Sequence, residues 1–75
     1  MIYKNTFAER LSVCRRNGKL SQKSLADIVG VSDAAINMME KGKRAPSFQV
    51  LCALADHFDV SLDYLVGRSN NPKRH

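Results

Sequence analysis

The chain has 75 residues, of which 44% are hydrophobic and 25% charged, and its formal net charge is +5. A chain of this length forms one small domain that buries only about 60% of its unfolded surface, which excludes most enzymes because they need an enclosed active-site cavity. No apolar run is long enough to span a bilayer, and no signal peptide opens the sequence. We therefore expect a single domain that has no contact with a membrane.

Apolar residues recur at helical spacing throughout the chain, which predicts an all-α fold of five helices. In the first helix Phe7, Leu11 and Cys14 follow one another at spacings of four and three. Thr6 is the expected N-cap of this helix, and the Asn-Gly pair at 17–18 is its expected stop.

The second and third helices are short and are separated by a tight turn. Ser21 is the expected N-cap of the second helix, which ends at Gly30. Ser32 is the expected N-cap of the third, which runs through Ile36 to Lys41 and is closed by a glycine.

Two further helices are predicted beyond a break at Pro46, with Ser47 and Ser61 as their N-caps. The expected core face of the fourth helix consists of Phe48, Leu51, Leu54, Ala55 and Phe58. In the fifth helix we expect Leu62 and Leu65 to face the core. Residues 67–75 are rich in polar and basic residues, so they are expected to form a mobile basic tail.

Charge is distributed unevenly between these segments. Residues 1–44 carry nine basic and four acidic side chains, whereas residues 45–66 carry three aspartates and no lysine or arginine. Such an arrangement is expected of a protein that presents one face to a polyanion and another to a different partner. Charge alone leaves nucleic-acid binding and simple solubility equally open.

The titratable side chains give no sign of catalysis or metal binding. Cys14 and Cys52 lack the paired spacing of metal ligands, and we interpret them as reduced core residues of a cytoplasmic protein. His57 and His75 have no carboxylate or cysteine partner at ligand spacing, and no nucleophile accompanies a base. The sequence predicts no catalytic residue, no metal site and no cofactor.

Two short helices around a tight turn, with a helix on either side, form a helix-turn-helix arrangement. Ala26 is small enough for the two helices to approach closely, Gly30 can adopt a positive φ angle, and Ile36 is placed to hold the third helix on the second. Several segments also match a known family: Leu20–Ala26, Gly30–Ser32, Ile36, Met39–Arg44, Pro46 and Val60–Leu65. In these segments the chain resembles the lambda-repressor-like helix-turn-helix family, also called the Cro or XRE family, over residues 7–66.

The resemblance implies a five-helix DNA-binding domain with its helix-turn-helix motif at about residues 22–41. Members of this family are usually dimeric transcriptional repressors of bacteria and phages. The expected function is thus a sequence-specific regulator that binds double-stranded DNA, as a homodimer on a pseudo-palindromic operator. The alternative is a protein-interaction module, such as an antitoxin, whose main contact is a regulatory protein partner.

The resemblance also assigns roles to individual residues. The positions that would read base edges, on the exposed face of the third helix, are Asp33, Ala34, Asn37 and Met38. The positions that would contact the DNA backbone are Gln22, Lys23, Ser32, Lys41, Lys43 and Arg44. The positions that form a largely buried ion pair are Arg15 and Glu40. Without the resemblance, Gln22, Asp33 and Asn37 would more readily be interpreted as ordinary solvent-facing side chains.

The sequence departs from the family pattern at two places. Family members often have glycine where Lys19 stands, so the end of the first helix is expected to differ. The recognition face carries Asp33 and no arginine, which favours binding that depends on dimerisation or on a restricted DNA sequence. A helix of about one and a half turns cannot bury all its apolar side chains, so we expect the dimer interface among Val60, Tyr64 and Val66.

Overall fold

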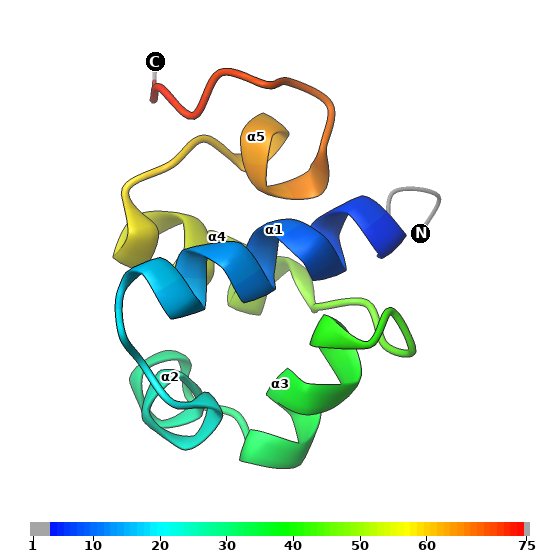
Figure 1. Cartoon of the computed structure of the whole chain (residues 1–75), viewed down its shortest axis with the longest axis vertical. Helices are drawn as coiled ribbons and strands as arrows, with labels where there is room; N and C mark the ends of the chain where they lie inside the picture. Colours follow the sequence, from blue (N-terminus) through cyan, green and yellow to red (C-terminus); the bar gives the residue numbers. More distant parts are fainter. Residues whose placement is uncertain (1–3, 75) are drawn as a thin grey trace.

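The computed structural model describes residues 4–74, in which five α-helices and no strand are present. The helices are α1 (Lys4–Asn17), α2 (Gln22–Val29), α3 (Asp33–Glu40), α4 (Phe48–Phe58) and α5 (Leu62–Val66). In Figure 1, α1 crosses the middle of the molecule, with α2 and α3 on one side and α5 with the C-terminal segment on the other. The predicted all-α fold is confirmed, and no helix within residues 4–74 has both the length and the apolar character needed to cross a membrane.

A serine N-cap precedes each of the helices from α2 to α5. In every case the serine Oγ accepts a hydrogen bond from the backbone N–H three residues later, as predicted for Ser21, Ser32, Ser47 and Ser61. The prediction for the first helix is wrong, because Thr6 lies inside α1 rather than before it. Its methyl group instead lies against the backbone of Gly67, at the end of α5.

All five helices end in the same backbone arrangement, in which an N–H beyond the helix donates to a carbonyl five residues earlier. The residue before that N–H adopts the left-handed conformation. Glycine fills this position after α2, α3 and α5, but Lys19 (φ 59°) fills it after α1 and Asp59 (φ 54°) after α4. The predicted stop at 17–18 is therefore one residue early, because the N–H of Leu20 closes the turn onto Arg15 O.

Replacement of Lys19 by glycine should raise the free energy of unfolding by about 0.5–1 kcal/mol. Glycine removes a left-handed penalty of about 1–2 kcal/mol but adds flexibility to the unfolded chain. Urea unfolding of Lys19→Gly and of the matched control Lys19→Ala measures this effect, because the control removes the same charge and keeps the strain. Equal midpoints for the two variants would contradict the explanation.

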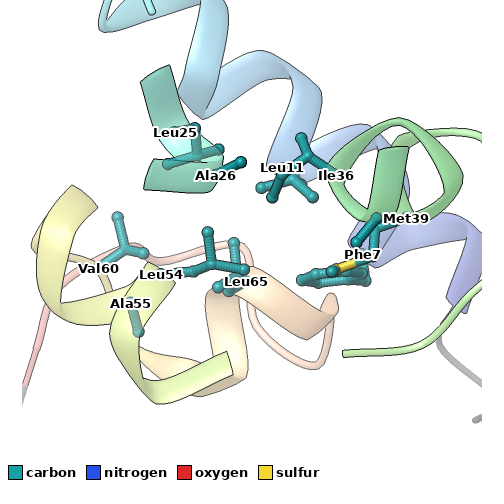
Figure 2. Close-up of a cluster of buried hydrophobic side chains, with 11 residues drawn as sticks. Phe7, Leu11, Leu25, Ala26, Ile36, Met39, Leu54, Ala55, Val60 and Leu65 are labelled. Atoms are coloured by element: carbon teal, nitrogen blue, oxygen red, sulfur yellow. The ribbon is translucent and has the colours of Figure 1, made fainter. Parts of the chain in front are cut away.

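Side chains from all five helices meet in one core, most of which is shown in Figure 2. Its largest fully buried members are Phe7, Leu11, Leu25, Ile36, Met39, Leu54 and Leu65. Cys14 and Cys52 are free thiols, but they are half-buried and lie outside this core, contrary to prediction. Partial burial raises the pKa of the Cys14 thiol, so it stays protonated at neutral pH.

Three apolar residues of the C-terminal half differ from expectation. Phe48, expected in the core, is 75% exposed because it is the first residue of α4 and the helix buries its next turns through Leu54 and Ala55. Leu62, also expected in the core, is 39% exposed. Val60, predicted to lie in the dimer interface, is 8% exposed, because the turn after α4 directs it into the core.

Residues 68–74, which we call the C-terminal strap, belong to the segment for which composition predicts a mobile tail, and in the structure they contact the helices. Arg10 of α1 donates hydrogen bonds to Tyr64 O (2.7 Å), Ser69 O (3.0 Å) and Asn70 Oδ1 (2.9 Å). The N–H of Ser61 donates to Pro72 O at 3.0 Å. These contacts join residues far apart in the sequence, which composition cannot reveal. His75, the last residue of the predicted tail, lies outside the described residues.

Candidate nucleic-acid interface

The turn between α2 and α3 sets the geometry of the helix-turn-helix motif. Gly30 has φ 79° and ψ 34°, as its predicted role requires, and its N–H donates to Ala26 O. Ala26 and Ile36 are almost completely buried, so α2 and α3 pack closely. Because α3 buries Ala35, Ile36 and Met39, its opposite face points away from the core.

That outer face carries the four residues predicted to read base edges. Asp33, Ala34 and Met38 are exposed and Asn37 is half-buried. Asp33 Oδ1 accepts the N–H of Ala34 at 3.0 Å, which holds this carboxylate at the start of the helix. Such side chains can hydrogen-bond or contact base edges in a major groove: asparagine suits adenine, a carboxylate can accept from cytosine N4, and alanine suits the thymine methyl.

The residues predicted to contact the DNA backbone lie on segments next to this face. Lys23 is exposed on the first turn of α2, and Lys41, Lys43 and Arg44 are exposed in the loop after α3. Ser32 is also exposed, and its Oγ accepts from the N–H of Ala35, so its hydroxyl hydrogen remains able to donate. These groups supply the positive charge and the donors that phosphates require.

A bidentate ion pair holds α3 on α1. Arg15 Nε lies 2.6 Å from Glu40 Oε2 and Arg15 Nη2 lies 3.0 Å from Glu40 Oε1. The side chains are 16% and 8% exposed, and the hydrogen bond to Glu40 raises the pKa of Arg15, which keeps it charged. Arg15 Nη1 also donates to Leu20 O at 2.8 Å, so the pair predicted from the resemblance also fastens the loop before α2.

Gln22 extends this network and braces α3, a role that the resemblance to the family implies for this position. Its Nε2 donates to Glu40 Oε1 at 3.2 Å, so the first residue of α2 is tied to the last residue of α3. Half-buried, Gln22 reaches the surface beside the N-terminus of α2. Gln22 and Glu40 are 18 positions apart, and no local pattern in the sequence indicates a contact at that separation.

The described residues offer little for chemistry of another kind. No cluster of three or more histidine, cysteine, aspartate or glutamate side chains within residues 4–74 could hold a metal ion. A hollow of about 640 Å³ lies between α1, the end of α4, α5 and the strap, whereas the predicted DNA-contacting residues lie on α2, α3 and the loop after α3. The outer face of α3 and its neighbouring basic loop are therefore the candidate site.

The fold and this surface define a helix-turn-helix protein of the lambda-repressor-like type. The chain belongs to the HTH_3 helix-turn-helix family, which it matches over residues 11–65. It is 39% identical over 67 residues to the uncharacterized HTH-type transcriptional regulator YqaE of Bacillus subtilis, a match that covers 89% of this chain and 58% of YqaE. The chain thus spans little more than half the length of this relative.

A phage repressor and a controller protein of known structure are also similar to the chain. Repressor protein C2 of Salmonella phage P22 is 36% identical over 58 residues, which covers 77% of this chain and 27% of the repressor. The crystal structure of the P22 c2 repressor in complex with a synthetic operator superposes with a TM-score of 0.76 at 36% identity, covering 79% of this chain and 89% of that one. The restriction-modification controller protein C.AhdI of Aeromonas hydrophila superposes with a TM-score of 0.73 at 30% identity, covering 81% and 88%.

Proposed function

We propose that the chain is a sequence-specific DNA-binding transcriptional regulator that represses by binding a pseudo-palindromic operator as a homodimer. The observation that carries this proposal is the outer face of α3, which presents Asp33 and Asn37 beside a basic loop while its inner face is fixed in the core. The similarity to the P22 c2 repressor, which was crystallised with an operator, supports it. A regulator of this kind acts in the cytoplasm, where bacterial DNA lies.

In this proposal the site residues divide into two groups. Asp33, Ala34, Asn37 and Met38 read base edges and give the sequence preference. Gln22, Lys23, Ser32, Lys41, Lys43 and Arg44 contact sugar and phosphate, so they set register and overall affinity. Because Glu40 holds Gln22 through its amide N–H, the ion pair behind the recognition helix also positions one of the backbone contacts.

The homodimer is proposed to form through α5. Tyr64 and Val66 are half-buried and Leu62 is exposed, so this short helix still offers apolar surface for a second copy. Val60 is left out of the interface because the core already buries it. A two-fold axis beside α5 would set two recognition helices about 34 Å apart, one turn of B-form DNA.

Selection of bound sequences from a random duplex pool is the test of specificity, and recovery of a two-fold-symmetric motif is the expected result. On the selected operator, Asn37→Ala should cost about 1–3 kcal/mol of binding free energy and relax selection at one base pair in each half-site. Lower affinity with an unchanged motif would move Asn37 to the group of backbone contacts. Failure to enrich any motif would contradict the proposed function.

Salt dependence tests the phosphate contacts separately. The logarithm of the binding constant should fall with the logarithm of salt concentration at a slope of about −0.9 per phosphate contact, or roughly −4 to −8 for a dimer. Lys43→Ala should weaken binding to all duplexes alike and make the slope shallower, whereas Asn37→Ala should leave the slope unchanged. A slope near zero for the unaltered chain would show that it does not bind DNA through phosphate contacts.

A further inference from the structure

The C-terminal strap contacts the turn between α4 and α5 and lines parts of two hollows. Pro72 forms part of the wall of the larger hollow, of about 640 Å³, together with Phe58 and Tyr64. On the other side, Arg74 lines a smaller hollow with Ser61, Leu62 and Asp63. The strap therefore lies next to Tyr64 and Leu62, two of the residues that we place in the homodimer surface.

The segment that holds α4, α5 and the turn between them is acidic, and Arg10 of α1 meets it on the Tyr64 side. Residues 45–66 carry Asp56, Asp59 and Asp63 and no lysine or arginine. Arg74 Nη2 lies 2.7 Å from Asp56 Oδ1, and its Nη1 lies 3.8 Å from Asp59 Oδ1. The hydrogen bond to Asp56 raises the pKa of Arg74, so the strap delivers a permanent positive charge to the acidic turn.

The Arg74 guanidinium also lies at the carbonyl end of α4, where the helix backbone carries a partial negative charge. Its Nη1 donates to Ala55 O at 3.3 Å, in the last turn of α4, and the carbonyl end of a helix attracts cations. The N–H of Ser61 holds the strap through Pro72 O, two residues before Arg74. Two hydrogen bonds, one accepted by Ala55 O and one by Pro72 O, thus fix the position of the guanidinium. The Arg74 side chain is still 43% exposed, so another molecule can reach it.

A two-fold axis beside α5 brings this acidic turn close to its own copy, because a two-fold contact pairs the same surface of both subunits. Without the strap, the aspartates of the two subunits would repel each other across the interface. With it, each subunit presents an arginine among its aspartates, and charges of opposite sign can alternate. We propose that the strap is part of the homodimer surface, where Arg74 neutralises the α4–α5 turn so that a second copy of this chain can dock.

This inference rests on the proposed homodimer, and its test compares neighbouring lysine and arginine positions. Arg74→Ala and Lys73→Ala remove the same charge, but the Lys73 side chain forms no ion pair among the described residues. The dimer dissociation constant, measured by sedimentation equilibrium and by cooperative titration of a full operator, should rise about tenfold in Arg74→Ala, since each subunit then brings aspartates without their arginine to the interface and the two acidic turns repel each other. In Lys73→Ala it should change less than threefold. Circular dichroism checks that both variants stay folded.

A second variant separates the charge of Arg74 from its shape. Adding Asp56→Asn to Arg74→Ala removes the carboxylate that lost its partner, so dimerisation should recover most of the tenfold loss. High salt should also reduce the difference between Arg74→Ala and the parent chain, because it screens repulsion between exposed charges.

The possible failures are distinguishable. If the unaltered chain binds single half-sites but never dimerises, on the operator or free, the proposed homodimer fails and the inference fails with it. If the chain dimerises and Arg74→Ala equals Lys73→Ala, the inference alone is overturned. Tighter dimerisation in Arg74→Ala would also overturn it, since the strap would then cover the interface instead of contributing to it.

Discussion

Replacement of Glu40 by alanine should lower the free energy of unfolding by about 3 kcal/mol. The substitution leaves the Arg15 guanidinium charged and only 16% exposed, without its bidentate partner. Loss of one partner from a buried pair costs about 3–5 kcal/mol, and the lower end applies here because Arg15 keeps its hydrogen bond to Leu20 O. A domain of this size has roughly 4–11 kcal/mol in total, so the variant should begin to unfold at moderate temperature.

Thermal and urea unfolding measure this loss of stability. Two control variants show whether it comes from the unpaired charge of Arg15. Glu40→Gln keeps the hydrogen-bond acceptor without the charge, so it should cost less than alanine. The double variant Arg15→Met/Glu40→Leu removes both charges and should recover most of the stability, because apolar residues of similar volume can replace a buried ion pair. A cost below about 1 kcal/mol for Glu40→Ala would mean that the pair behaves as an exposed surface contact.

Gly67→Ala should cost about 2–4 kcal/mol, since two separate effects act at this residue. Its φ of +91° lies in the region that L-residues avoid, which costs about 1–2 kcal/mol. An added Cβ would also clash with Thr6 Cγ2 and approach Thr6 Cβ to 2.7 Å, and overpacking of this kind costs about 1–3 kcal/mol. Part of the clash can be relieved if α5 moves away from α1, at the expense of its packing.

Gly30→Ala is the matched control, because Gly30 has φ +79° and a Cβ there would meet nothing within 4 Å. It should show the conformational cost alone, so the difference between the two variants in urea unfolding isolates the contact between α1 and α5. Thr6→Ala should rescue Gly67→Ala only in part, since the Thr6 Cβ remains. Equal losses at the two glycines would show that the contact with Thr6 carries no energy.

Short-range features of this protein were predictable from the sequence. The serine N-caps and the glycine at the turn of the motif act on backbone groups within five residues, so the local sequence is enough to specify them. The exposure of Asp33 and Ala34 followed from helical periodicity once Ile36 was placed in the core. The Arg15–Glu40 pair came from the resemblance to the family, because 25 residues separate its members and no periodicity joins them.

Only the tertiary structure decided which residues are exposed in the C-terminal half and where the last segment lies. Val60 and Leu62 are apolar neighbours in the sequence, but the left-handed Asp59 turns Val60 into the core, while Leu62 stays exposed at the start of α5. Residues 68–74 have the composition of a mobile tail, yet Arg10 holds this segment from 59 and 60 residues away through bonds to the backbone carbonyl of Ser69 and the side-chain amide of Asn70, and it also bonds the carbonyl of Tyr64 in α5. Backbone carbonyls are identical at every position, so composition cannot indicate which of them a distant arginine will reach. Which carbonyls Arg10 contacts is determined only when α1 and α5 pack together.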